Sequence, residues 1–143
     1  MKSPIAKETM KLAVTALLLA LCTDCRFFKQ GARHKQVEAK TNLSNIYTMQ
    51  KIYKGANNTY AKTFWRLNFI PAGEGNYSYF MGEDVISASI GGPYQVPEGI
   101  ESEITRDSYR VVAVANLDVD PTLDVWVIDN ENRMRNLVDD VDE

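Results

Sequence analysis

The sequence is poor in the residues from which small enzymes and metal sites are built. Its 143 residues include one histidine, His34, and two cysteines, Cys22 and Cys25. These three cannot supply the four ligands of a closed Cys/His zinc site. Two cysteines three residues apart cannot staple a secreted scaffold through long loops, so we expect burial to stabilise the core. A Ser-His-Asp or Cys-His mechanism would have to use His34, which has no placed nucleophile nearby, and we expect the protein not to be an enzyme.

A long hydrophobic run is also missing. The longest apolar stretch, Leu12 to Cys22, has eleven residues and follows three lysines. As a helix it would span about 16 Å, roughly half of a ~30 Å hydrocarbon layer, so it cannot cross a membrane unaided. Three interpretations remain open: a secretory signal, a lipoprotein signal, or half of a longer helix that neighbours bury.

Charge is unevenly distributed along the chain. Residues 1–66 contain twelve Lys/Arg and three Asp/Glu, a net charge of +9, whereas residues 67–143 contain four and sixteen, a net charge of −12. The basic half either meets an anionic partner, such as phospholipid headgroups or the acidic half of another copy, or is a solvated basic helix. With 45% apolar and 10% aromatic residues, the chain fits one globular domain with a short appendage.

Helical periodicity marks the middle of the first half. Apolar residues recur at Ala39, Leu43, Ile46 and Tyr53, and Gln50 fills the remaining position of this stripe. No proline lies between residues 26 and 53, so the apolar run and the stripe can form one helix of some forty residues. Gly31 would weaken it by about 1 kcal/mol, and Gly55 is suited to a left-handed cap at its end.

The second half of the sequence has patterns typical of β-strands. Residues 76–81, 109–117 and 123–128 alternate or are rich in β-branched residues, and Gly and Pro separate them. This predicts an α+β fold in which the helix covers an antiparallel sheet of roughly four strands. We expect a core under the helix from ten aromatic residues: Tyr47, Tyr53, Tyr60, Phe64, Trp65, Phe69, Tyr77, Tyr79, Phe80 and Tyr94.

An acidic segment between two predicted strands is a candidate metal site. Asp118, Asp120 and Asp124 occupy the first, third and seventh positions of DVDPTLD. Alternating carboxylates and backbone carbonyls can supply oxygen ligands to Ca²⁺. The alternative is a solvated acidic turn, because Pro121 follows and the glycine and distal glutamate of an EF-hand are missing.

Three segments together carry a resemblance to a known family. EAKTNLSNIYTMQKIYKGANNTYA (38–61) is similar to the second half of the long helix, and the loop after it, of the type IV pilins and the related pseudopilins. CRFFKQ (25–30) resembles the stretch that follows the membrane part of that helix, and VVAVANLDVDPTLDVWVI (111–128) resembles the last paired strands. The resemblance implies an N-terminal helix half or signal-like segment at 1–30. A pilin-like domain at 31–143 would comprise a helix half (31–54), a loop (55–75) and a sheet (76–143).

The resemblance also implies a function. Pilins are structural subunits that stay in the bacterial inner membrane until assembly machinery builds them into an extracellular filament. Counting back from Glu38 places the family's N-terminal glutamate on Glu8, which would neutralise the N-terminal amine of a neighbouring copy. Assembly of this helical homopolymer would bury the apolar side chains of Leu12, Val14, Leu17, Leu18, Leu19 and Leu21. No cofactor other than possible Ca²⁺, and no nucleic-acid partner, is expected.

The leader departs from the pilin pattern, which keeps other interpretations open. Ser3 stands where prepilin peptidase requires glycine, Pro4 replaces the customary aromatic residue, and Lys7 and Lys11 interrupt the apolar stretch. Instead of a cleaved, N-methylated pilin, the chain could be a soluble or lipid-anchored binding module exported to the periplasm or cell surface. A third possibility is a minor pseudopilin of a secretion system.

Overall fold

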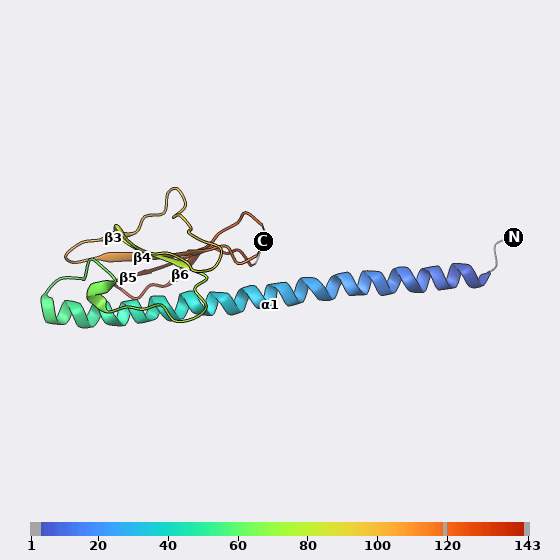
Figure 1. Cartoon of the computed structure of the whole chain (residues 1–143), viewed down its shortest axis with the longest axis horizontal. Coiled ribbons are helices and arrows are strands. Elements are labelled where there is room, and N and C mark those ends of the chain that lie inside the picture. Colours follow the sequence, from blue (N-terminus) through green and yellow to red (C-terminus); the bar gives the residue numbers. More distant parts are fainter. Residues whose placement is uncertain (1–3, 119, 142–143) are drawn as a thin grey trace.

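One long helix dominates the molecule. The computed structural model describes residues 4–118 and 120–141, and for residues 4–29 it describes the backbone alone. Helix α1 runs from Pro4 to Asn57, 54 residues without a break, which corresponds to a length of about 80 Å. Its C-terminal part lies along the sheet, and its N-terminal half extends beyond it as a rod (Figure 1). The prediction of a continuous helix is confirmed, and the helix is longer than the forty residues expected.

The helix ends three residues later than expected. Gly55 lies inside the last turn rather than at a left-handed cap. Asn58 takes that role with a φ of 54°, and its N–H donates to the Lys54 carbonyl at 2.9 Å. Asparagine tolerates the left-handed region better than most residues with a Cβ, so the helix can continue through Gly55 and stop at Asn58.

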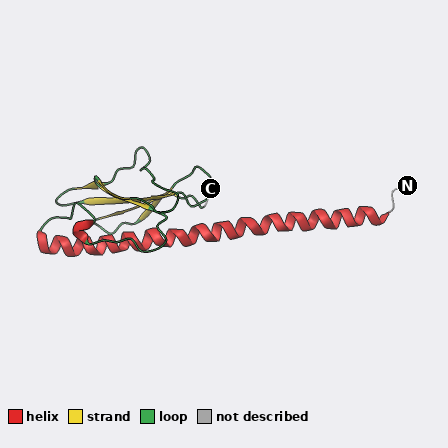
Figure 2. Cartoon of the chain, in the orientation of Figure 1, coloured by secondary structure: helices red, strands yellow, loops and turns green. Residues whose placement is uncertain are grey.

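A single antiparallel sheet follows the helix (Figure 2). A short 3₁₀ helix, η1 (Trp65–Leu67), lies between them. The sheet contains β1 (Ser78–Met81), β2 (Asp84–Ile86), β3 (Glu103–Ile104), β4 (Tyr109–Ala115), β5 (Asp124–Asp129) and β6 (Arg135–Val138). The strand order is β2-β1-β4-β5-β6, with β3 also paired to β4. The α+β class is confirmed, but the prediction of roughly four strands was too low because β2, β3 and β6 have only two to four residues.

The predicted stripe packs α1 onto one face of the sheet. Ala39, Leu43 and Ile46 are fully buried, as is Gln50, while Tyr53 is half-buried. The apolar members of the stripe join the alternate residues of β4 and β5 that face the helix, among them Val111 and Ile128, in one hydrophobic cluster. The apolar face of the helix, with a period of 3.6 residues, and that of the strands, with a period of 2, therefore pack together in one core.

The opposite face of the sheet is also apolar. Val112 and Val114 of β4 and Val125 and Val127 of β5 form a second buried cluster. Within residues 4–118 and 120–141 no helix covers it; residues of the irregular segment between β2 and β3, including Tyr94, Val96 and Ile100, pack against it instead. Both faces of the central strands are thus buried, which explains why β4 reads as a nearly continuous apolar run.

Most of the aromatic residues expected in the core are there. Phe64, Phe69, Tyr77 and Tyr79 are buried under the helix and form a chain of ring contacts. Two corrections apply. Trp65 is 86% exposed because η1 turns it outward while Phe64 and Leu67 face inward, and Phe80 packs on the opposite face of the sheet because it alternates with Tyr79.

Candidate assembly and ion-binding sites

The predicted assembly residues lie on the free half of α1. Glu8 and the apolar residues Leu12, Val14, Leu17, Leu18, Leu19 and Leu21 all fall within Pro4–Asn57, in the part of α1 that projects from the domain (Figure 1). Their side chains, like those of Cys22 and Cys25, are outside the described residues, so their role stays a prediction. Among the described residues, no helix combines the length and hydropathy needed to cross a membrane.

On the domain half of the helix, a buried carboxylate ties α1 to the loop before the sheet. Glu38 Oε1 accepts hydrogen bonds from the backbone N–H groups of Asn76 at 2.9 Å and Tyr77 at 3.4 Å. Its Oε2 accepts from the Glu74 N–H at 3.1 Å and from Asn76 Nδ2 at 2.8 Å. A Cβ at Gly73 would lie 2.8 Å from the Glu38 side chain, and Gly73 has a φ of +109°. The loop can close over this carboxylate because a glycine stands there.

Two amides on the same helix act in a similar way. Asn42 Nδ2 donates to the Ala72 carbonyl at 2.8 Å and Asn42 Oδ1 accepts from the Ala72 N–H at 2.9 Å. Gln50 makes the same paired contact with Ala61, at 2.9 Å in both directions. Both side chains are fully buried. Each amide therefore satisfies a backbone donor and acceptor of the loop that no strand could pair.

Asp124 lies at the centre of a buried polar network. Its Oδ2 accepts from Tyr77 Oη at 2.5 Å and Trp126 Nε1 at 2.6 Å, and its Oδ1 accepts from Gln36 Nε2 at 3.0 Å and Asn136 Nδ2 at 3.1 Å. Burial of the Tyr77 phenol, reinforced by the charge and hydrogen bond of Asp124, holds the pKa of Tyr77 well above its usual range. The network joins α1, β5, β6 and Tyr77, the residue before β1.

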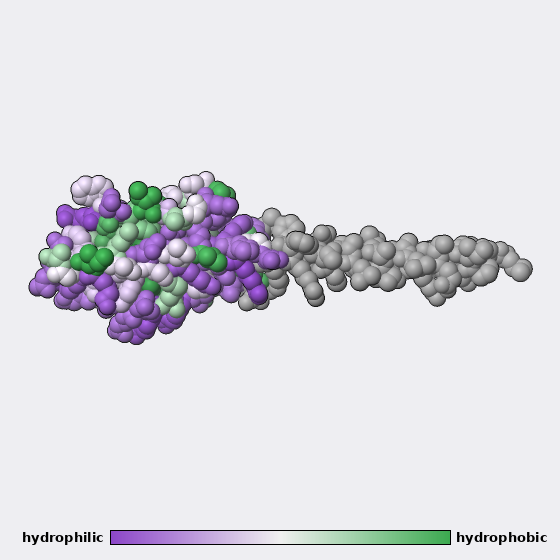
Figure 3. Space-filling model, turned by 90° about the horizontal axis from the view of Figure 1, so that it is seen from below, coloured by the Kyte–Doolittle hydropathy of each residue, from purple (hydrophilic) through white to green (hydrophobic). Residues whose placement is uncertain are grey.

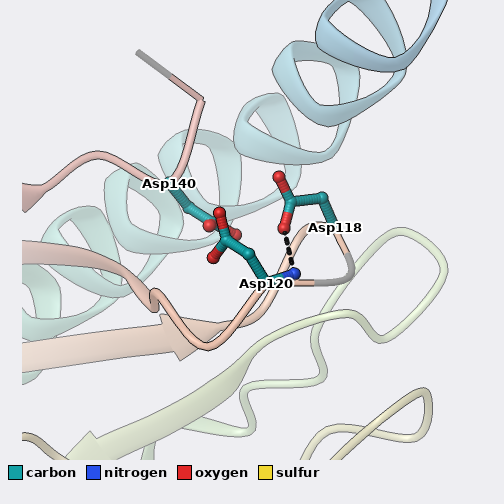
Figure 4. A group of neighbouring side chains, drawn as sticks. All are labelled: Asp118, Asp120 and Asp140. Atoms are coloured by element: carbon teal, nitrogen blue, oxygen red, sulfur yellow. Dashed lines mark hydrogen bonds between the residues drawn. The ribbon is translucent and has the colours of Figure 1, made fainter. Parts of the chain in front are cut away.

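This network corrects part of the predicted metal site. Asp124 does not join Asp118 and Asp120, because it begins β5 with its side chain directed to the helix face of the sheet, where both oxygens are occupied. The structure instead groups Asp118 and Asp120 with Asp140, and one ligand oxygen of each lies within 4.8 Å of the others (Figure 4). The three carboxylates are the candidate metal ligands among the described residues.

Strand topology explains why Asp140 arrives there. β6 runs antiparallel to β5, with Val138 opposite Val125, so β6 ends beside the start of β5. The connection that carries Asp118 and Asp120 leads from β4 to this same start of β5. Asp140 Oδ2 accepts the Leu117 N–H at 2.6 Å, which fastens the C-terminal segment to that connection.

The electrostatic setting of Asp140 is unfavourable for a charged carboxylate. Its side chain is buried, with 4% of the residue exposed, and this loss of hydration raises the pKa of Asp140 to about 6. The hydrogen bond from Leu117 opposes the rise, and the negative charges of Asp118 and Asp120 add to it. Oδ1 of Asp140 is buried without a hydrogen-bond partner in the part of the chain that the structure describes, which is uncommon for a carboxylate oxygen.

The surface of the domain is mostly hydrophilic. Hydrophobic spots are scattered over the face seen in Figure 3 rather than joined in one large patch. The exposed large apolar residues of the described chain are Val37, Ile52, Trp65, Ile70, Val85, Ile90 and Leu137. Single exposed apolar side chains are normal for a soluble surface. The face seen in Figure 3 therefore shows no extended apolar patch among the described residues.

No protein-family model matches the sequence. Over 114 residues, 78% of the chain, it is 31% identical to the type IV major pilin protein PilA of Myxococcus xanthus. The chain is similar to a type IV pilin. It spans about half the length of that relative, and the similarity agrees with a fold in which a long N-terminal helix packs on an antiparallel sheet.

Sequence reasoning missed several of the residues that organise this pilin-like domain. Glu38 and Asn42 are spaced by four, as helical neighbours on one face are, but their polarity hid them from a search for apolar periodicity. Asp140 could not be connected to Asp118 from sequence, since only the pairing of β6 with β5 brings them together. The same pairing takes Asn136 to Asp124.

Proposed function

We propose that the chain is a structural subunit of a type IV pilus-like filament that assembles through the N-terminal half of α1. The observation that carries the proposal is the unbroken helix from Pro4 to Asn57. It joins the apolar run to the buried stripe and projects from the domain (Figure 1). The similarity to a type IV major pilin supports it. A rod anchored to a folded domain at one end can pack lengthwise against copies of itself.

Buried hydrogen bonds join the domain half of α1 to the loop and the sheet. Glu38, Asn42 and Gln50 hold the loop, and Gln36 reaches both Asp124 and Asp139 at 3.0 and 2.9 Å. These bonds fix the angle between the domain and residues 36–50 of the helix, on which a regular polymer depends. Burial of each large apolar side chain of the rod between neighbours would contribute about 1.5–3 kcal/mol.

In this proposal Glu8 sets the register between subunits. It is the only acidic residue among the first 23. A buried carboxylate is costly unless it is paired, so a contact with the N-terminal amine of a neighbour would select one arrangement of the rods over others. Before assembly the chain would reside in the inner membrane, and afterwards it would form an extracellular filament on the cell surface. The pilus assembly machinery would be its partner.

The variant Glu8→Ala tests this role. We expect the variant to fold and to reach the membrane fraction in amounts similar to wild type, but to form no filaments, as judged by shearing and electron microscopy. Asp24→Ala is the matched control, since it removes the next acidic residue along the chain, and it should still polymerise. Normal filaments from Glu8→Ala would refute the role of Glu8.

The leader is the reason to keep a second candidate. Ser3 and Pro4 depart from the residues expected around a prepilin cleavage site, which favours an exported binding module that reuses the fold. Mass spectrometry of the mature N-terminus separates the two. A start at Met1 or Pro4 retains the rod, whereas a start beyond residue 20 removes it. A minor pseudopilin would keep the rod and differ in copy number.

A further inference from the structure

We propose that Asp118, Asp120 and Asp140 form a Ca²⁺ site that fastens the end of the chain to the connection between β4 and β5. The site differs from the one predicted from sequence, because Asp140 replaces Asp124. It is separate from the proposed assembly function, since none of its residues lies on the rod.

The geometry admits one ion between the three carboxylates. Their ligand oxygens lie within 4.8 Å of one another. Two oxygens on opposite sides of a Ca²⁺ ion, each at 2.3–2.6 Å, lie about 4.6–5.2 Å apart. The three side chains converge from two segments (Figure 4), so a common ion would bind with little movement of the backbone.

An unpaired oxygen points independently to a ligand. Asp140 is 4% exposed, and among the described residues its Oδ1 has no hydrogen-bond partner although its Oδ2 accepts from Leu117. In Figure 4 the Asp140 carboxyl is directed toward that of Asp120. Two carboxylates face each other with no donor between them at this oxygen, and a cation is the partner that would satisfy both.

The surroundings of the group orient its other members. Asp118 Oδ1 accepts the Asp120 N–H at 2.9 Å, and Asp120 Oδ1 accepts the Thr122 N–H at 2.7 Å. Asn116 Nδ2 holds the Asp120 carbonyl at 2.5 Å. These bonds fix the connection in a tight bend and leave one side of the carboxylates open, because Asp118 and Asp120 are both exposed. Water can therefore complete the coordination sphere.

The donor set selects calcium among common metals. All the candidate ligands are oxygens, which hard cations prefer, whereas zinc prefers nitrogen and sulfur ligands. Mg²⁺ keeps several waters and is usually held by one or two carboxylates. Three protein carboxylates with room for water match the six to eight oxygen ligands of Ca²⁺.

Isothermal titration calorimetry of the full chain in mild detergent, with CaCl₂ alone as the probe, tests the site. We expect saturable binding of one Ca²⁺ per chain and at least tenfold weaker binding of Mg²⁺. Calcium at a hundredfold excess over its Kd should raise the melting temperature by about 5–10 °C. Absence of saturable binding up to 10 mM Ca²⁺ would overturn the proposal, as would equal affinity for Mg²⁺.

Variants separate this site from other carboxylates. Asp140→Asn should lower the affinity for Ca²⁺ at least tenfold. Asp118→Asn, at an exposed position, should do the same without affecting the fold. Glu131→Gln, an exposed carboxylate in the turn between β5 and β6, is the control and should bind like wild type. Unchanged affinity in Asp118→Asn and Asp140→Asn would place the ion elsewhere and refute the assignment, whether or not filaments form.

Discussion

At the scale of residues, polar side chains bind the helix to the loop that follows it. Glu38, Asn42 and Gln50 project from α1 into the interior and bind backbone groups of residues 61–77. No strand of the described residues pairs with this loop, so its donors and acceptors would otherwise be buried unsatisfied. The three residues fall in the segment 38–61 that resembles pilins, and the structure shows a physical reason for each of them there.

Gln50 offers the sharpest test of this account. Gln50→Ala should lower the free energy of unfolding by about 2–4 kcal/mol, because it leaves the Ala61 N–H and carbonyl unpaired in the core. The thermal melting of the full chain in mild detergent, followed by circular dichroism, measures the effect. Ser44→Ala, at an exposed position of the same helix, should change stability by less than about 0.5 kcal/mol. Equal melting of both variants and wild type would contradict the role of Gln50.

At the scale of elements, the continuity of α1 matters most. Gly31 lies near the point where the helix leaves the domain, and the helix passes through it without interruption. No neighbouring atom lies within 4 Å of a Cβ built at this glycine. Its only effect is then the conformational freedom that glycine gives to the backbone. The junction between rod and domain is weakened there without any packing benefit among the described residues.

Replacing this glycine should stiffen the junction. Gly31→Ala should stabilise the helix locally by about 1 kcal/mol, and slow hydrogen exchange of the amides around residue 31 by roughly fivefold. Hydrogen–deuterium exchange read by mass spectrometry measures this. Gly55→Ala, also in open space but in the last turn, is the control and should have a smaller effect on residues around 31. Unchanged or faster exchange in Gly31→Ala would contradict the role of this glycine in loosening the junction.

At the scale of the whole molecule, charge and shape are arranged along one axis. The basic half of the sequence contains all of α1, and the acidic half contains every strand of the sheet. Lysines of α1 also contact the domain: Lys35 Nζ donates to the Leu117 carbonyl at 2.9 Å, and Lys54 pairs with Asp107 at 2.8 Å. In a polymer of parallel rods, the domain of one copy would lie near the basic helix of another.

Salt should therefore oppose assembly. Raising NaCl from 0.1 to 1 M shortens the Debye length from about 10 to about 3 Å, and we expect less polymer to sediment after removal of detergent. Assembly driven by apolar burial alone would be unchanged or strengthened by salt. Sucrose at equal osmolality is the control for effects unrelated to charge. Sedimentation that does not fall with NaCl would contradict an electrostatic contribution between copies.

Local patterns predicted much of the fold. The apolar stripe without proline predicted α1, and the alternating residues predicted β1, β4 and β5. These patterns depend only on neighbours in sequence, and the structure confirms the elements that they predicted. The short strands β2, β3 and β6 were missed because two to four residues carry too little periodicity to be recognised. The outward turn of Trp65 was missed for a related reason, since one turn of 3₁₀ helix has no repeating pattern.

The candidate sites were also predicted only where the sequence pattern is local. Glu8 and the apolar residues of the rod were selected from the sequence and its resemblance to pilins, and they stay a prediction. The acidic segment was found from spacing alone, but its third member was wrong. Spacing placed Asp124 beside Asp118 and Asp120, whereas the alternation of β5 turns Asp124 to the helix face, toward Tyr77 and Trp126.

The sequence by itself determined a helix followed by a sheet, the face by which the helix packs, and the opposite charges of the two halves. These follow from composition and from periodicities that each segment carries on its own. Only the tertiary structure decided which polar groups form hydrogen bonds in the interior and which carboxylates lie together where β5 begins and β6 ends. Such contacts depend on strand pairing and loop closure between residues as far apart as Gln36 and Asp139, which are 103 positions apart, and no local pattern encodes those distances.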